Sequence, residues 1–266
     1  MRSRECTKLM RKEIEKIADK LVNAYKKSKL INPIPTKYVK NIKNATSLRK
    51  LCESKIKTKV VGFKAGGTAL PVLKKLKEKE PFYSAIFKNN VLNSGKSVKI
   101  NPSTLGIEVE VGYLINKKFF DNKGMITMKN ISKFISHMMP CIEVVGYRQK
   151  KKGIKFLGDL ASDFGANIKF VVGSKKKFKR LNIDNLKCSI KNVKTGDVIY
   201  GNTNTVYINP LNSLRFVLNK MRKDKVKLNS NFFVFTGSAV GVVPLNNKGM
   251  YIAKIDKIGT VKSAIR

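Results

Sequence analysis

The segment 106–115, GIEVEVGYLI, places two glutamates at alternate positions of an otherwise apolar run. This alternation predicts a β-strand on which Glu108 and Glu110 share one face, about 7 Å apart, while the apolar residues between them face a core. Two carboxylates held this close repel each other, and burial would also remove their hydration. The fold must therefore bring positive charge to this strand, either from lysines or from a bound cation.

A second apolar run, PCIEVVGY at 140–147, carries a third acid, Glu143. Acidic side chains are seldom buried without a partner. Hard divalent cations such as Mg²⁺ take carboxylate oxygens as ligands and keep several waters. Three glutamates on two apolar strands therefore predict a site for a divalent metal ion, with pairing to lysines as the alternative.

Helical spacing of apolar residues between 14 and 25 predicts an amphipathic helix that ends before NPIP at 32–35. A second helix is expected at about 47–55. The pattern then changes to short runs separated by Gly, Asn and Pro, which favour strands. Strands are expected at 59–66, 109–115, 141–145, 169–172, 186–191, 198–200 and 232–235, and further helices at 71–79, 129–138 and 211–223. We therefore expect an α+β fold in which a helical segment, 1–58, packs on a β-rich domain, 59–266.

The four cysteines, Cys6, Cys52, Cys141 and Cys188, form no Cys-x-x-Cys pair and have no histidine at zinc-ligand spacing. They are typical of reduced thiols in a cytosolic protein. The longest apolar stretch, 232–245, is too short and too interrupted by glycine to span a membrane. We therefore expect a cytoplasmic protein without a membrane span.

Lysine and arginine number 56 against 17 acidic residues, which gives a formal net charge of +39. A charge of this size favours contact with polyanions. The bases are scattered, with local clusters at 74–79, 150–152, 175–180 and 220–227, and the sequence contains no zinc finger, RNP-type aromatic strand or helix-turn-helix signature. A solvated basic surface is the alternative. We expect at most weak, sequence-independent binding of nucleic acid.

Six motifs, taken in chain order, resemble segments of the fumarylacetoacetate hydrolase superfamily. Within it, the sequence is most similar to the branch of the 2-keto-4-pentenoate hydratases and 4-oxalocrotonate decarboxylase. The motifs are GFKAGGT at 62–68, GIEVEVGYLI at 106–115, CIEVVGYR at 141–148, LASDFGANIKFVVG at 160–173, NPLNSLRFVLNKM at 209–221 and FFVFTGSAVGVVPL at 232–245. The resemblance covers nearly the whole chain and implies a β-rich, mixed-sheet roll with a helical N-terminal segment.

This resemblance implies that Glu108, Glu110 and Glu143 hold Mg²⁺ or Mn²⁺. In the family, the metal chelates the 1-carboxylate and the 2-keto oxygen of a 2-keto acid and stabilises its enolate. A 2-hydroxy-2,4-dienoate can then ketonise and take up water, whereas a decarboxylase uses the same electron sink to release CO₂. The expected protein is a hydratase-like lyase and a homo-oligomer, with a small 2-keto or 2-hydroxydienoic acid as substrate.

Five further residues acquire expected roles from the resemblance. Lys64 matches the active-site lysine of the family, which pairs with the substrate carboxylate or transfers a proton. The turn Thr236-Gly237-Ser238 is expected to present N–H groups and hydroxyls to the substrate anion. Asp163 is expected to support the metal ligands from behind, with capping of a loop as the alternative.

The sequence departs from the family at one place. Phe82 stands where the hydratases carry an aspartate and Ser84 where glycine is usual, so an acid that would position water has no counterpart here. A hydrolase of acylpyruvates is a further alternative, but it needs a histidine–glutamate pair, and His137 lies away from the motifs and is expected to be structural. The last alternative, an enzyme-derived scaffold that binds RNA or a ribonucleoprotein, gives no reason to keep three glutamates.

Overall fold

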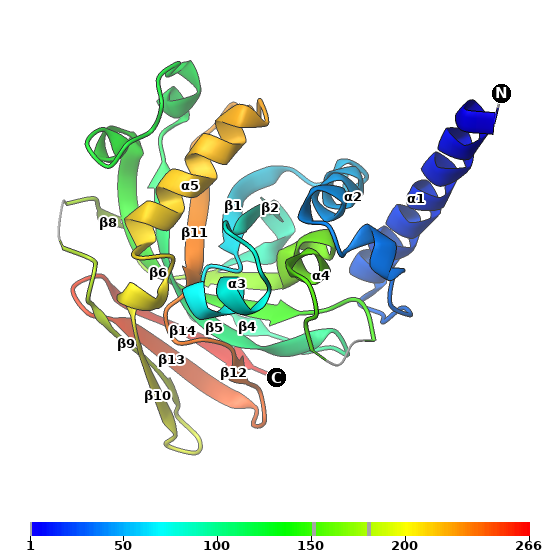
Figure 1. Cartoon of the computed structure of the whole chain (residues 1–266). Coiled ribbons are helices and arrows are strands. Elements are labelled where there is room, and N and C mark those ends of the chain that lie inside the picture. The colour runs from blue at the N-terminus through cyan, green and yellow to red at the C-terminus, as the bar shows by residue number, and fades with distance from the viewer. Residues whose placement is uncertain (1, 151–152, 180–181) are drawn as a thin grey trace.

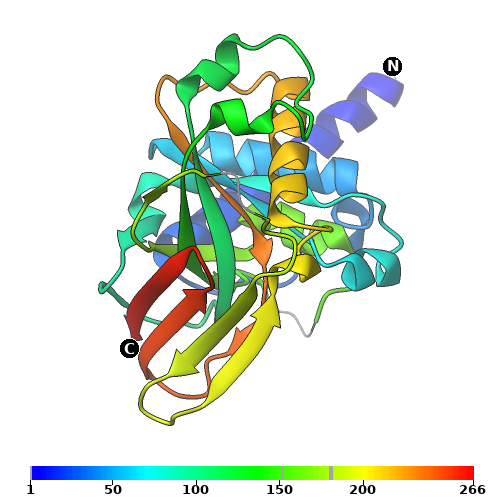
Figure 2. The ribbon, with the colours of Figure 1, turned by 90° about the vertical axis from the view of Figure 1, so that its left-hand side faces the viewer.

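Two β-sheets form the centre of the structure, and helices lie against the larger one (Figure 1). The computed structural model describes residues 2–150, 153–179 and 182–266. Figure 2 shows the smaller sheet, which contains the C-terminal strands, below the larger one. Apolar side chains of both sheets meet in one continuous core, to which Val109 contributes from the large sheet and Ala253 from the small one.

The large sheet has the strand order β2-β1-β11-β5-β6-β7-β3, with β12 paired to β5 and β8 paired to β6. The pairs β1–β11 and β3–β7 are parallel and the other pairs are antiparallel. Its strands are β1 Val60–Gly66, β2 Phe82–Phe87, β3 Val91–Asn93, β5 Thr104–Ile115, β6 Ile135–Gly146, β7 Asn167–Val172, β8 Lys176–Lys177, β11 Phe232–Ser238 and β12 Val243–Pro244.

The small sheet has the order β10-β9-β13-β14-β4, and only its β14–β4 pair is parallel among the described strands. Its strands are β4 Ser97–Val98, β9 Lys187–Asn192, β10 Val198–Asn202, β13 Gly249–Ile255 and β14 Gly259–Ile265. Strands β13 and β14 pack on β6 of the large sheet. This contact places the middle of the small sheet beside the strands that carry the glutamates.

The helices are α1 Arg2–Lys27, α2 Ile42–Ser54, α3 Leu70–Lys75, α4 Leu157–Ser162 and α5 Pro210–Lys223. Asn41 caps α2 by accepting the N–H of Lys43, and Asn209 caps α5 by accepting the N–H of Asn212. Helix α5 packs on β11 and β1, whereas α2 packs on α1 and α4. Short 3₁₀ turns occupy Thr36–Tyr38, Lys88–Asn90, Lys117–Asp121, Ile131–Phe134, Phe164–Ala166 and Thr203–Thr205.

The α+β fold class predicted from the sequence is confirmed, and each expected strand lies in or overlaps an observed one. The helix expected at 129–138 is wrong, because only the 3₁₀ turn Ile131–Phe134 forms there and β6 begins at Ile135. Pairing with β5, which joins Leu114 to His137, extends the backbone of this segment. The division into units 1–58 and 59–266 remains a prediction.

Cys52, Cys141 and Cys188 are free, buried thiols, while the side chain of Cys6 lies outside the described part. Burial raises the pKa of Cys52 and of Cys188 to about 12, so both stay protonated. None of the described helices is both long and apolar enough to span a lipid bilayer.

Candidate active site

The three glutamates come together on the antiparallel pair β5–β6. Glu108 lies directly opposite Glu143, and Glu110 lies opposite Cys141. Glu110 and Glu143 are completely buried, and one carboxylate oxygen from each of the three glutamates lies within 4.8 Å of the others. The apolar residues that alternate with the acids, Ile107, Val109 and Val111, fill the core on the opposite face, as the alternation in the sequence predicts.

Burial and mutual repulsion act on all three carboxyl groups. Burial raises the pKa of Glu108 to about 7; the charge of Glu143 adds to this rise, and that of Lys64 opposes it. Burial also raises the pKa of Glu110 and that of Glu143, again against the effect of Lys64. Without a metal ion, the cluster therefore retains protons that ordinary carboxylates would have lost.

Lys64 is the cation closest to the cluster and is itself buried on β1. Its Nζ lies 2.8 Å from Glu143 Oε1 and donates a hydrogen bond of 3.2 Å to the carbonyl of Gly165. Burial lowers the pKa of Lys64, but the surrounding carboxylates, Glu143 first, outweigh that effect and raise it. Lys64 is thus held protonated against the acids.

One lysine does not satisfy three clustered carboxylates, of which two are completely buried. Glu110 Oε1 and Glu143 Oε2 are buried and accept no hydrogen bond from the residues described. Buried carboxylate oxygens without a partner are costly, and converging ones are the ligands that a hard divalent cation binds. The donor set therefore fits Mg²⁺ or Mn²⁺, and Glu108, Glu110 and Glu143 would hold it.

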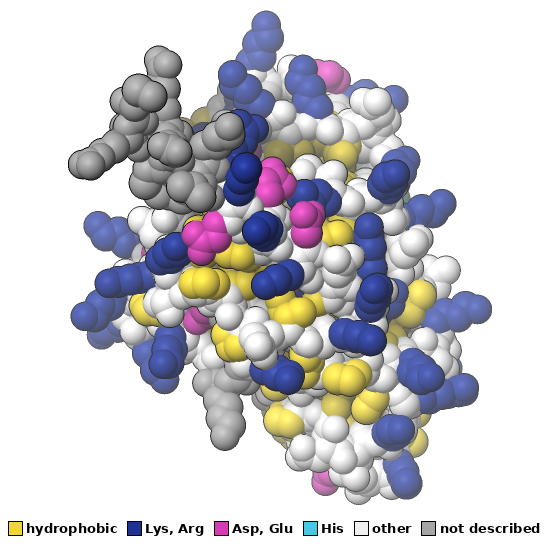
Figure 3. Space-filling view, turned by 90° about the vertical axis from the view of Figure 1, so that its right-hand side faces the viewer, with side chains coloured by type: hydrophobic (Ala, Val, Ile, Leu, Met, Phe, Trp, Pro, Cys, Tyr) yellow, Lys and Arg dark blue, Asp and Glu magenta, His cyan; other side chains and the backbone are white. Residues whose placement is uncertain are grey.

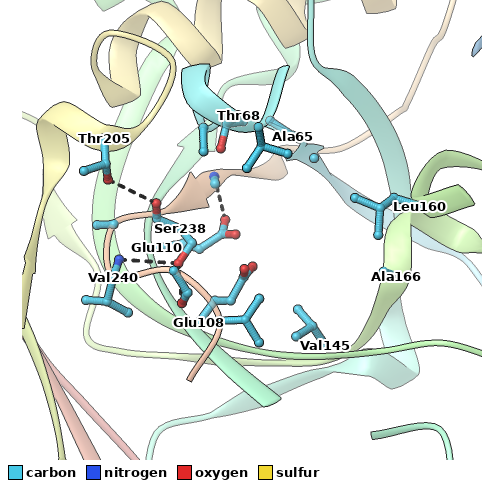
Figure 4. Close-up of a pocket in the computed structure, with 18 of the residues that line it drawn as sticks. Ala65, Thr68, Glu108, Glu110, Val145, Leu160, Ala166, Thr205, Ser238 and Val240 are labelled. Atoms are coloured by element: carbon cyan, nitrogen blue, oxygen red, sulfur yellow. Dashed lines mark hydrogen bonds between the residues drawn. The ribbon is translucent and has the colours of Figure 1, made fainter. Parts of the chain in front are cut away.

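The last residues of β11, which were expected to form a turn but belong to the strand, support this cluster through the backbone. The N–H of Gly237 donates to Glu110 Oε2 at 2.9 Å (Figure 4). Gly237 has φ +105°, and a Cβ there would overlap the hydroxyl of Thr68, so only glycine fits. Ser238 also borders the cavity, and its hydroxyl donates to the carbonyl of Gly241.

Thr236 lies in the same end of β11, but its hydroxyl has another partner. Thr236 Oγ1 donates to the carbonyl of Val111 at 2.9 Å, and the Thr236 carbonyl accepts from Ser213. The side chain thus ties β11 to β5 and α5, and it does not border the cavity. Its expected role as a substrate ligand remains a prediction, as does that of Gly237 and Ser238.

Asp163 is buried behind the site, and its hydrogen bonds go to the segment after β6. Its carboxylate accepts the backbone N–H of Arg148 at 2.8 Å and Nε2 of Gln149 at 3.2 Å, and it pairs with the Arg148 guanidinium. Asp163 therefore anchors the loop whose Gly165 carbonyl accepts from Lys64. No role was predicted for Arg148 from the sequence, although it ends the motif CIEVVGYR.

Phe82 begins β2, beside the lysine strand, and its ring borders the cavity. A Cβ on Gly66 would overlap this ring, so the aromatic packs directly on β1. Ser84 packs against Gly165, which has φ +67°. The place at which the family hydratases carry an acid is thus part of an apolar wall.

A cavity of about 780 Å³ opens over the carboxylates. Figure 4 shows Glu108 and Glu110 pointing into it, between Val145 on one side and Val240 on the other. Other parts of the wall come from residues far apart in the sequence, such as Leu105, Tyr147 and Tyr200. His137 is not among the lining residues; its Nδ1 lies 3.2 Å from the hydroxyl of Ser136.

No family model matches the chain. It is 27% identical to a 2-keto-4-pentenoate hydratase of Burkholderia vietnamiensis over 77% of this chain and 78% of the relative. A 4-oxalocrotonate decarboxylase from Pseudomonas putida G7, solved with magnesium and adipate, has a TM-score of 0.84 and 16% identity over 96% of this chain and 98% of its own. A fumarylpyruvate hydrolase from Pseudomonas aeruginosa, solved with Mn²⁺ and pyruvate, has a TM-score of 0.57 and 11% identity over 79% of this chain and 91% of its own.

The fold and these relatives point to one class: in fold, the chain is similar to solved proteins of the fumarylacetoacetate hydrolase superfamily. In sequence it is similar to 2-keto-4-pentenoate hydratases, and in fold to 4-oxalocrotonate decarboxylase, the two kinds of enzyme that the motifs resemble.

Proposed function

We propose that the protein is a metal-dependent hydro-lyase that hydrates a 2-hydroxydienoic acid through the enolate of a 2-keto acid. The observation that carries the proposal is the cluster of three glutamates and one buried lysine beneath a cavity of about 780 Å³. The curated relatives, which are hydratases, support the reaction class.

Each group has a defined task in this reaction. Bound by the glutamates, Mg²⁺ or Mn²⁺ would supply positive charge where negative charge develops on the 2-oxygen. Lys64, held protonated by Glu143, places a second positive charge beside the substrate carboxylate and can return a proton. Gly237 fixes Glu110, and the apolar wall limits the access of bulk water.

The overall reaction adds one water to the diene. The enol proton leaves the 2-oxygen, and the far end of the diene takes up a proton. Water then adds to C4, the carbon next to that end. The resulting enolate is protonated at C3, which lies between C4 and the keto carbon. The product is a 4-hydroxy-2-oxo acid. Decarboxylation is the second candidate, because Phe82 occupies the place of a water-positioning acid and the same electron sink would accept the electrons released with CO₂.

The direct test supplies 2-hydroxypenta-2,4-dienoate to the Mg²⁺- or Mn²⁺-loaded protein. We expect loss of the dienol absorbance with formation of 4-hydroxy-2-oxopentanoate, followed by proton NMR. Deuterium from D₂O should also enter the carbon next to the keto group of bound 2-keto acids. Failure of a folded, metal-loaded protein to exchange any 2-keto acid would rule out the enolate chemistry.

Metal binding is expected to raise the Tm, and to raise it more at about pH 8 than at about pH 6. The pKa of Glu108 in the folded, metal-free protein is about 7 instead of its ordinary 4.5. The stabilisation by protonated Glu108 is therefore fully present below pH 4.5 and is lost as the pH rises through 7. Metal ions displace these protons more easily at the higher pH. Thermal denaturation with and without Mn²⁺ at both pH values measures the difference, and an equal increment at both would contradict it.

Nucleic acid is expected to bind weakly and to dissociate as salt is added, because binding would depend on counterion release. Figure 3 shows lysine and arginine spread over one face of the molecule rather than gathered in one track. Fluorescence anisotropy with unrelated DNA and RNA duplexes across a salt series measures this dependence. Tight binding that persists at about 150 mM salt would favour the recruited-scaffold alternative instead.

A cytoplasmic location and a homo-oligomer complete the proposal. The buried, protonated thiols of Cys52 and Cys188 are compatible with a reducing compartment. Fractionation of cells and light scattering of the purified protein would test the two points separately.

A further inference from the structure

The cavity wall carries much less positive charge than the rest of the chain. The sequence has 56 lysines and arginines. Along the wall as far as the structure describes it, Lys64 is the only cationic side chain, and it is already paired with Glu143. A substrate bound at the glutamates would therefore find no described cation for a second carboxylate at its far end.

Large hydrophobic side chains surround the opening instead. Five that line the cavity are more than a third exposed, and they come from four separate segments: Leu70, Val72, Leu105, Tyr200 and Val242. Apolar surface that is gathered at a cavity and left in water is typical of a ligand-binding surface, since a ligand that covers it regains the hydrophobic free energy. Tyr200, at 77% exposure, extends this surface onto the small sheet.

The apolar wall runs from the opening toward the carboxylates. Leu105 precedes Glu108 by three residues on β5, which is about 10 Å along a strand. Val242 packs beside it over Gly106, and the buried side chains of Phe82 and Val145 line deeper parts of the wall. A chain with its 2-keto acid end at the glutamates would therefore have its tail along this surface.

We propose that the site selects 2-keto and 2-hydroxydienoic acids that have a single carboxylate and a long, uncharged apolar tail, and that it disfavours dicarboxylic ones. This inference rests on the proposed function, because the glutamates and their metal ion must bind the keto-acid end. Val242 and Leu105 determine the specificity for the tail. They contact the part of the substrate that does not react.

The experiment measures the affinity of the Mn²⁺-loaded protein for a matched series of 2-keto acids by calorimetry. The series is pyruvate, 2-oxopentanoate and 2-oxooctanoate, together with 2-oxooctanedioate, which adds a carboxylate to the longest tail. Affinity should rise about two- to fourfold for each methylene placed on the wall. The dicarboxylate should bind about ten- to a hundredfold more weakly than 2-oxooctanoate, because its second carboxylate would lose hydration without gaining a partner.

Two matched variants assign the effect to the wall. Val242→Arg places a cation at the opening, and it should raise the affinity for 2-oxooctanedioate about tenfold relative to 2-oxooctanoate. Val193→Arg is the control, because Val193 is also an exposed valine, 49% against 47%, but it does not line the cavity. The control variant adds the same charge and should leave the ratio of the two affinities unchanged.

The outcomes separate this inference from the proposed function. If pyruvate binds but longer tails gain nothing, or if wild type prefers the dicarboxylate, the inference is wrong while the enolate chemistry stands. A change of ratio that is equal in Val242→Arg and Val193→Arg would also overturn it, because the effect would then be one of general charge. If the metal-loaded protein binds none of the acids, both proposals fail.

Discussion

Glu108→Gln is expected to abolish turnover, lowering it by at least about a thousandfold, while the metal-free protein stays folded. The loss follows because the amide cannot supply the charge that a divalent cation needs at this position. Stability should be kept or should rise slightly. Burial and the neighbouring charge of Glu143 both disfavour the ionised form of Glu108, and the substitution removes that unfavourable charge. The ion pair between Lys64 and Glu143 is unchanged.

The measurement combines calorimetric titration with Mn²⁺, the Tm with and without the metal, and deuterium exchange of a 2-keto acid. Glu13→Gln is the control, since Glu13 is an exposed glutamate on α1 that pairs with Lys37. It should retain both the metal response and the activity. A Glu108→Gln protein that binds Mn²⁺ as tightly as wild type would remove Glu108 from the ligand set.

Lys64→Met has the second large effect, and it should act on activity and stability together. Turnover should fall about 10²- to 10⁴-fold, as for the loss of a proton-transferring group. The free energy of unfolding of the metal-free protein should fall by about 3–5 kcal/mol, because Glu143 would remain buried without its cation. Mn²⁺ should then raise the Tm of this variant more than that of wild type, since the metal replaces the missing positive charge.

Lys169→Met provides the comparison for Lys64→Met. Lys169 is a partly buried lysine on β7, and its Nζ donates to the carbonyl of Asn89 away from the cavity. That variant should exchange deuterium at the wild-type rate and show the ordinary metal response. If Lys64→Met exchanges deuterium as fast as wild type, the lysine takes no part in the reaction, whatever its effect on folding.

The cluster of three glutamates was predictable from the sequence because strand geometry is local. Alternation alone puts Glu108 and Glu110 on one face of a strand, and an acid within an apolar run marks Glu143. Pairing β5 with β6, the next long strand, then brings the three together. The same reasoning failed at 129–138, where the partner strand determines the conformation and helical spacing of apolar residues does not.

The cavity wall could not be predicted in the same way. Leu105, Tyr200 and Val242 belong to segments that meet only after the small sheet has packed against the large one. Their exposure in the folded state is the signal, and a sequence does not contain it. The hydroxyl of Thr236 likewise follows from the tertiary fold, because its acceptor, Val111, is on a different strand.

The confinement of all three glutamates to one pair of consecutive strands has an evolutionary consequence. Their mutual positions depend on the β5–β6 pairing, whereas much of the opening is built by β10, α3 and the turn before β12. Substitutions in those outer segments can therefore change the shape and charge of the opening while the glutamate cluster stays intact. In such an architecture the opening can vary one segment at a time, independently of the carboxylates beneath it.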